Sequence, residues 1–185
     1  IPNSVTSIGG SAFYNCTNLA LTSLPESLTS IGSDAFYGCK NLALTSLSSG
    51  VTSIGNGAFY GCTNLALTSL SESLTSIGSS TFYNCKNLAL TSLPSGLTKI
   101  EANAFQSCIK LALTSLPSGI TSIGYGAFHG CTGLTEITFE GKPNSITANA
   151  FGGCTNLTII RVPWNEGEVD GAPWGASSAS IVYAY

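Results

Sequence analysis

The sequence predicts a repeat solenoid, a right-handed superhelix of 23-residue coils with short parallel strands. Three observations lead to this fold class. The seven cysteines recur at a constant interval of 23 residues, a phenylalanine precedes each of them by three residues, and a leucine follows each by three. A single unit could not bury these side chains alone, but stacked units could, because each position then lies on its counterpart in the next coil.

The cysteine and phenylalanine positions are predicted to form two columns in one core. Identical positions in neighbouring coils project in parallel, whereas a disulfide needs two side chains that point at each other. An odd number of cysteines also argues against complete pairing. We therefore expect free thiols that pack as small hydrophobic groups, with occasional disulfides as the alternative. The predicted core columns contain Cys16, Cys39, Cys62, Cys85, Cys108, Cys131, Cys154, Phe36, Phe59, Phe82, Phe105 and Phe128.

One unit, residues 97–119, illustrates the elements that are expected in every coil. Its apolar positions keep neither the period of a helix nor that of a strand throughout, so the chain must turn repeatedly. Residues 111–117 predict a short strand that ends at a proline. The Ala-Phe-x-x-Cys segment is too short for an independent helix and predicts a short helical or 3₁₀ turn. Glycines that follow the isoleucine position, such as Gly32, or precede cysteine, such as Gly38, predict turns with positive φ.

The repeat pattern resembles a known family. Leu-x-x-Ile-x-Ile/Val-Pro-x-x-Val-x-x-Ile-x-x-x-Ala-Phe-x-x-Cys-x-x-Leu is similar to the BspA-like (Treponema-type) leucine-rich repeat of bacterial and protozoan surface proteins. The resemblance covers roughly residues 1–163, and Ala-Phe-x-x-Cys occurs six times, with Thr81 in place of alanine in the seventh copy. It implies a leucine-rich-repeat superhelix. In units such as residues 88–93 the middle aliphatic residue stands one place early, which leaves the strand register on one face open.

The asparagines two residues after cysteine resemble the asparagine ladder of leucine-rich repeats. In that ladder the side-chain amides bond main-chain groups from coil to coil, and we expect the same of these residues. They are Asn18, Asn41, Asn64, Asn87 and Asn156.

The chain divides into a repeat array, residues 1–163 with about seven coils, and a non-repeat C-terminal cap, residues 164–185. The first residues align with the middle of a unit, so the array is expected to be truncated at its N-terminus, as a piece of a longer protein or an excised domain. Both tryptophans lie in the predicted cap. A cap has a physical purpose, because the last coil would otherwise expose strand edges and apolar core to water.

Composition excludes several function classes. Six basic against nine acidic residues give a net charge of −3, which does not fit a nucleic-acid-binding surface. No apolar stretch is long enough for this segment to insert into a membrane. The cysteine spacing matches no metal site, and no phosphate-binding or dinucleotide-binding motif occurs, so no cofactor is expected.

No residue pattern points to catalysis. The only histidine, His129, takes a position that holds tyrosine, glutamine or glycine in other units, which favours a surface residue. Acidic residues gather late in the chain, at Glu166, Glu168 and Asp170, where a solvated cap loop is expected and a weak Ca²⁺ site is the alternative. We therefore predict that the protein is not an enzyme; an enzymatic alternative would need acids clustered on one face.

The surface most suited to binding is predicted from two series of polar residues. Stacked coils place successive members about 5 Å apart, the spacing of neighbouring strands. The result is a flat uncharged hydroxyl face with amphipathic aromatic contacts, and a plain solvating surface is the alternative. The predicted binding face contains Thr29, Thr52, Thr75, Thr98, Thr121, Tyr37, Tyr60 and Tyr83. Ice binding by these threonines is disfavoured, because neighbouring Thr and Ser are expected to alternate between faces.

The function expected from the solenoid shape and the family resemblance is recognition. Extended repeat surfaces serve binding, and the resemblance implies secretion or attachment to a bacterial cell surface. We predict a non-enzymatic extracellular adhesion module that binds protein or glycan on a host or bacterial surface. The alternative is a structural spacer or fibre component of a cell-surface or phage appendage. The sequence does not identify the partner.

Overall fold

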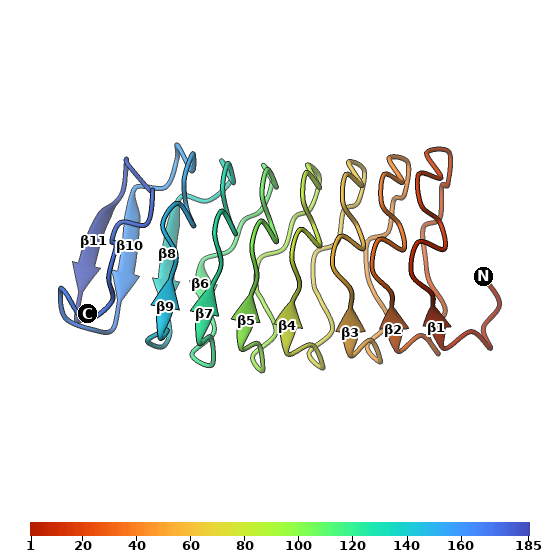
Figure 1. The fold of residues 1–185 in the computed structure, drawn as a ribbon, viewed down its shortest axis with the longest axis horizontal. Helices are drawn as coiled ribbons and strands as arrows, with labels where there is room; N and C mark the ends of the chain where they lie inside the picture. The colour runs from red at the N-terminus through yellow and green to blue at the C-terminus, as the bar shows by residue number, and fades with distance from the viewer.

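The computed structural model describes residues 1–185 as a row of stacked coils, with the two termini at opposite ends of the long axis (Figure 1). Residues one repeat apart lie beside each other in successive coils, so residues of the same type form columns. The secondary structure consists of short strands joined by turns, and none of it is a helix that could span a membrane.

One face carries seven two-residue strands, which pair in parallel. Each strand places its isoleucine against the isoleucine of the next coil, for example Ile8 against Ile31. The ladder is interrupted once, between β3 and β4, where the main-chain N–H of Ser79 donates to Asn56 Oδ1 at 3.0 Å instead. The strands are β1 (Ser7–Ile8), β2 (Ser30–Ile31), β3 (Ser53–Ile54), β4 (Ser76–Ile77), β5 (Lys99–Ile100), β7 (Ser122–Ile123) and β9 (Ser145–Ile146).

A second sheet occupies another face and is confined to the C-terminal half. Its order is β11-β10-β8-β6, all parallel, with β6 (Ser115–Leu116) at one edge, followed by β8 (Glu136–Phe139), β10 (Ile159–Val162) and β11 (Ser180–Tyr183). The four-residue strands β8 and β10 occur where the sequence returns to family spacing, and they alternate buried and outward residues. In earlier coils two outward residues stand between buried leucines, as between Leu90 and Leu93. That spacing interrupts the alternation of a longer strand, and residues 111–116, which share it, form only the two-residue strand β6.

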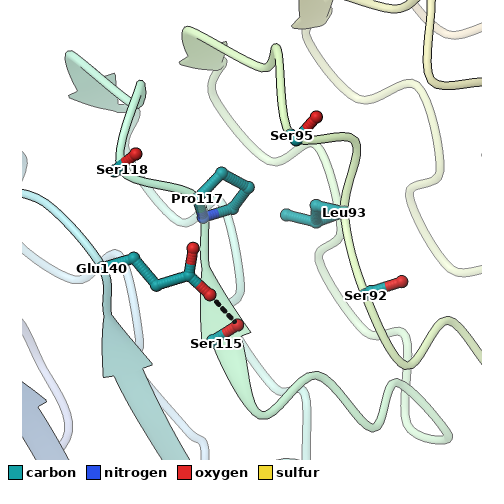
Figure 2. Close-up of a pocket in the computed structure, with 7 residues that line it drawn as sticks. All are labelled: Ser92, Leu93, Ser95, Ser115, Pro117, Ser118 and Glu140. Carbon is teal, nitrogen blue, oxygen red and sulfur yellow. Dashed lines mark hydrogen bonds between the residues drawn. The ribbon is translucent and has the colours of Figure 1, made fainter.

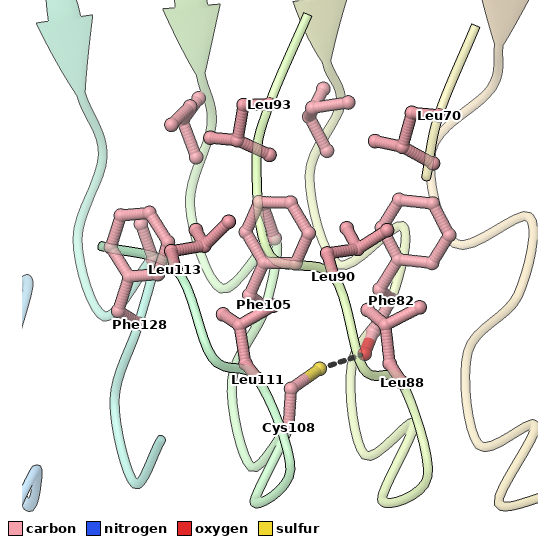
Figure 3. Close-up of a cluster of buried hydrophobic side chains, with 14 of the residues drawn as sticks. Leu70, Phe82, Leu88, Leu90, Leu93, Phe105, Cys108, Leu111, Leu113 and Phe128 are labelled. Carbon is pink, nitrogen blue, oxygen red and sulfur yellow. Dashed lines mark hydrogen bonds between the residues drawn. The ribbon is translucent and has the colours of Figure 1, made fainter. Parts of the chain in front are cut away.

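The core is one continuous cluster of stacked side chains (Figure 3). The phenylalanine rings stack almost parallel, with centroids 5.5 Å apart for both Phe82–Phe105 and Phe105–Phe128. All seven cysteines are free, and those from Cys39 to Cys154 are buried. Each buried thiol donates to the phenylalanine carbonyl of the preceding coil, as Cys108 Sγ does to Phe82 O at 3.0 Å. The expectation of a core position is wrong for Cys16, which is exposed because no coil covers it in the described chain.

The predicted helical or 3₁₀ turns are wrong. Around Phe36, alternate N–H groups bond within the turn and across to the next coil: Tyr37 N donates to Asp34 O at 3.0 Å, whereas Phe36 N donates to Ala58 O at 2.8 Å. Two residues of the turn have positive φ, Asp34 at 55° and Gly38 at 70°. A right-handed helix tolerates neither the alternation nor the positive φ, so the coil-to-coil bonds replace it with a sequence of tight turns.

Glycine is required for different reasons at the position before cysteine and at the position after isoleucine. Gly38 has the expected positive φ of 70°, and Asn15 in the same position of the first unit has a φ of 55°. The expectation is wrong for Gly32, whose φ is not positive; there a Cβ would lie 2.5 Å from the main-chain nitrogen of Gly10 in the preceding coil. Gly32 is therefore required for close approach of two coils rather than for turn geometry.

The asparagine ladder is also largely absent. Only Asn156 makes the expected bond, from Nδ2 to Thr132 O at 2.8 Å, and Asn18, Asn41, Asn64 and Asn87 make no side-chain hydrogen bond. Recurring side-chain hydrogen bonds between coils come instead from the cysteine thiols and from threonine hydroxyls.

Residues 164–185 form an irregular final coil that closes the C-terminal end. Trp164 and Trp174 are buried against Phe139, with ring centroids 5.3 Å and 5.9 Å from it. The indole N–H of Trp174 donates to Asp170 O at 2.7 Å. The chain then adds β11 beside β10, so the aromatic rings cover the apolar interior of the last repeat.

Candidate functional site

The threonines of the predicted binding face form one exposed column, in which each immediately precedes one of the strands β2, β3, β4, β5 and β7. Their hydroxyl groups bond to the threonine carbonyl of the preceding coil: Thr29 to Thr6 at 3.0 Å, Thr52 to Thr29 at 3.2 Å, and both Thr98 to Thr75 and Thr121 to Thr98 at 3.0 Å. Thr75 makes no such bond, because it follows the interruption between β3 and β4. The bonded hydroxyls have used their hydrogen, so they can only accept hydrogen bonds from a ligand.

A serine column runs directly beside the threonines. Thr29 is exposed and Ser30 half-buried, while their neighbours Leu28 and Ile31 are buried. The expectation that Thr and Ser alternate between faces is therefore wrong. The exposed face is therefore two residues wide, because a threonine and the serine that follows it both reach solvent in one coil, as Thr29 and Ser30 do.

The tyrosines form a second column, in the turns that follow the strands. Tyr14, Tyr37, Tyr60 and Tyr83 stack with centroid separations of 4.7, 4.4 and 4.4 Å and nearly parallel rings. Burial raises the pKa of the Tyr60 phenol, and the neighbouring phenols of Tyr83 and Tyr37 add to this shift. The column thus presents a continuous row of neutral ring edges and hydroxyls across four coils.

The uniform strand face changes at the coil that contains β5. Lys99 takes the serine position and Glu101 the glycine position, and together with neighbouring coils they border a shallow hollow of about 320 Å³. Glu101 Oε2 accepts a hydrogen bond from Ser79 Oγ at 3.0 Å, while Lys99 forms no ion pair. This is the one place on the threonine face where a ligand would meet full charges.

A separate pocket of about 230 Å³ lies on the other face, between residues 92–95 and β6 (Figure 2). The Glu140 side chain reaches over it from the end of β8 and accepts a hydrogen bond from Ser115 Oγ at 2.7 Å. Leu93 and Pro117 face each other across its apolar part. Sequence reasoning missed this pocket, because its members come from three coils and no single repeat contains the pattern.

The N-terminal end carries a third hollow, of about 330 Å³ and mainly apolar. Ile1, Val5, Ile8 and Phe13 line it. These side chains correspond to core positions of later coils, which a neighbouring coil covers.

The histidine and the late acidic residues do not form a common site. His129 is half-buried in the tyrosine position, and no group of three or more His, Cys, Asp or Glu side chains is placed to hold a metal ion. In the late acidic segment, Lys142 donates to Glu168 Oε2 at 2.6 Å and Asn165 to Glu168 Oε1 at 2.9 Å. These hydrogen bonds, with that from Lys142 the larger cause, lower the pKa of Glu168.

Comparison with known proteins agrees with the geometry. A model of the BspA type leucine-rich repeat region matches residues 1–112 and 98–170 and recurs in six copies. A leucine-rich repeat protein of Treponema pallidum is 35% identical with a TM-score of 0.71, and the match covers 83% of this chain and 72% of that one. No catalytic family is indicated, and no curated protein matches the chain.

Two further solved structures are longer than this chain. A leucine-rich repeat protein of Bacteroides ovatus is 26% identical with a TM-score of 0.70, over 99% of this chain and 53% of that one. A leucine-rich cell surface protein of Faecalibacterium prausnitzii is 26% identical with a TM-score of 0.54, over 85% of this chain and 59% of that one. The chain thus spans little more than half the length of these two relatives.

Proposed function

Because the chain belongs to the BspA-type leucine-rich repeat family, we propose that it is a non-enzymatic extracellular recognition module that binds a protein or glycan through its threonine and tyrosine columns. An extended repeat surface offers many equivalent positions to one long ligand. Such a surface suits a partner that is itself extended or repetitive.

The observation that carries this proposal is the tyrosine column. Stacked phenols hold one another in place, so little side-chain freedom remains to be lost when a ligand binds. Tyrosine combines apolar area with a hydroxyl that can donate or accept. Four such residues in register, with centroids 4.4 to 4.7 Å apart, form a pre-organised strip.

An extracellular location is part of the same proposal. The Faecalibacterium relative is described as a cell surface protein, and this family resemblance supports a surface or secreted role here. The threonine face fits this role, since hydroxyl groups cover most of it and Lys99 and Glu101 are its charged positions.

A spacer or fibre function is the second candidate, and the threonine column favours it. Hydroxyls that bond to the preceding coil stabilise the stack itself. In that case the coils would set a length, and no ligand would be needed.

Binding to an array of extracellular matrix proteins and glycans separates these functions. We expect binding that falls at least about tenfold in the variant Tyr37→Ser/Tyr60→Ser/Tyr83→Ser, since aromatic anchors dominate interfaces. Tyr125→Ser is the matched control, because Tyr125 is exposed and lies outside the column. Binding that the triple variant leaves unchanged would refute the assignment of the site, and absence of any binding would favour the spacer.

A further inference from the structure

The pocket beside β6 lies at a free sheet edge inside the solenoid. β6 pairs with β8 through the main-chain groups of Thr114 and Leu116, which accept from Thr138 N at 2.9 Å and Glu140 N at 3.0 Å. In a parallel ladder, alternate residues point to opposite sides. The N–H and C=O of Ser115 therefore face away from β8, toward the coil that contains Ser92 and Leu93.

That neighbouring coil does not complete the sheet. The main-chain N–H and C=O groups of Ser92 and Leu93 form no hydrogen bond within the chain, and neither do those of Ser115. Main-chain polar groups are strong donors and acceptors, so the β6 side of the pocket offers unused hydrogen-bonding capacity at Ser115.

The charge of the pocket is one-sided. Glu140 presents a carboxylate whose Oε1 accepts from Ser115 Oγ, which leaves Oε2 without a partner. Glu140 is the one charged side chain among the residues that line the pocket. No lysine, arginine or histidine lines the pocket, so the Glu140 carboxylate gives it a negative charge that attracts a cation.

The size of the pocket limits the ligand to one side chain. Its volume of about 230 Å³ is below the roughly 300–1,000 Å³ of sites for whole small molecules. Leu93 and Pro117 face each other across it and provide apolar contact for an aliphatic stem. Arginine and lysine have such stems and carry their charge at the tip.

We propose that this pocket binds a basic side chain, arginine in preference to lysine, from a protein partner. The guanidinium group has five N–H donors in a planar fork, which suits the free oxygen of Glu140 together with the unpaired carbonyl of Ser115. The site lies at the sheet that contains β6, on a different face from the threonine column (Figure 1), and the inference stands independently of the function proposed above.

The test is a titration of the whole chain with N-acetyl-arginine amide, followed by amide chemical shifts in NMR spectra. We expect weak saturable shifts confined to residues 92–95, 115–118 and 140. The variant Glu140→Gln should weaken binding about three- to fivefold, the range of an exposed ion pair. Glu101→Gln is the matched control, because Glu101 also accepts from a serine hydroxyl but lies beside Lys99 on the other face.

N-acetyl-citrulline amide keeps the shape of the arginine probe and removes its charge. Loss of the shifts with this probe, and their decrease with added salt, would support the proposal. Equal binding of both probes would overturn it, since the pocket would then recognise a neutral polar group such as a sugar hydroxyl. Shifts that are absent, spread over all acidic residues, or unchanged in Glu140→Gln would also overturn it.

Discussion

Replacing one ring in the phenylalanine column tests whether stability arises between neighbouring coils. Phe105 is fully buried and stacks on Phe82 and Phe128, each 5.5 Å away. Phe13 occupies the same repeat position but is half-buried and stacks on one ring only, Phe36, at 5.2 Å. The variants Phe105→Ala and Phe13→Ala therefore remove the same atoms from two environments.

The expected magnitudes differ by at least a factor of two. Truncation of a buried phenylalanine to alanine costs about 3–5 kcal/mol, from lost burial and the cavity left behind. Phe105→Ala belongs at the upper end, about 4–5 kcal/mol, because it also ends two ring stacks worth about 0.5–1.5 kcal/mol each. For Phe13→Ala we expect about 1.5–2 kcal/mol, since half the burial and one of two stacks are lost.

Urea unfolding followed by far-ultraviolet circular dichroism measures both changes. Tryptophan fluorescence is a second probe, because Trp164 and Trp174 both lie at the C-terminal end. Coincident transitions would show that the coils unfold together, and only then is one free energy of unfolding defined. Equal destabilisation by the two variants would refute the argument that neighbouring coils supply the stability of each unit.

Two further predictions concern glycine and the thiols. Gly32→Ala should destabilise by about 1–3 kcal/mol in urea unfolding, because its Cβ would meet rigid main chain of the preceding coil; Gly9→Ala, with nothing within 4 Å, should be neutral, and equal effects would contradict the close-approach argument. Burial raises the pKa of both Cys39 and Cys154 from 9.0 to about 11, so the folded state keeps protons that the unfolded state releases. The urea midpoint should therefore be constant below about pH 8 and fall between about pH 9 and 11; a midpoint that does not fall in this window would contradict the assignment of buried neutral thiols.

The sequence by itself predicted the architecture, because the same residue types return at a fixed interval of 23. A single 23-residue unit is too small to bury its apolar side chains, and a fixed interval allows equivalent coils to stack and bury them together. The periodicity also indicated positive φ at positions such as Gly38, since glycine and asparagine exchange there. These features are local to one repeat and are copied many times.

Interactions between coils were decided only by the tertiary structure. The turn around Phe36 is not helical, because its alternate N–H groups find acceptors in the next coil. Cysteine and threonine, rather than asparagine, supply the repeated side-chain hydrogen bonds from coil to coil. A single sequence contains the donors and acceptors of each turn but not the distance to those of its neighbour.

The pocket beside β6 shows the same division most clearly. Glu140, Ser115 and Leu93 belong to successive coils, and each looks ordinary within its own repeat. Only the change from unpaired coil to paired sheet at β6 brings them around one hollow. The periodic sequence therefore determined the features that every coil shares. Residues that depart from the repeat form a site only together with residues of adjacent coils, and the tertiary structure alone decides which residues those are.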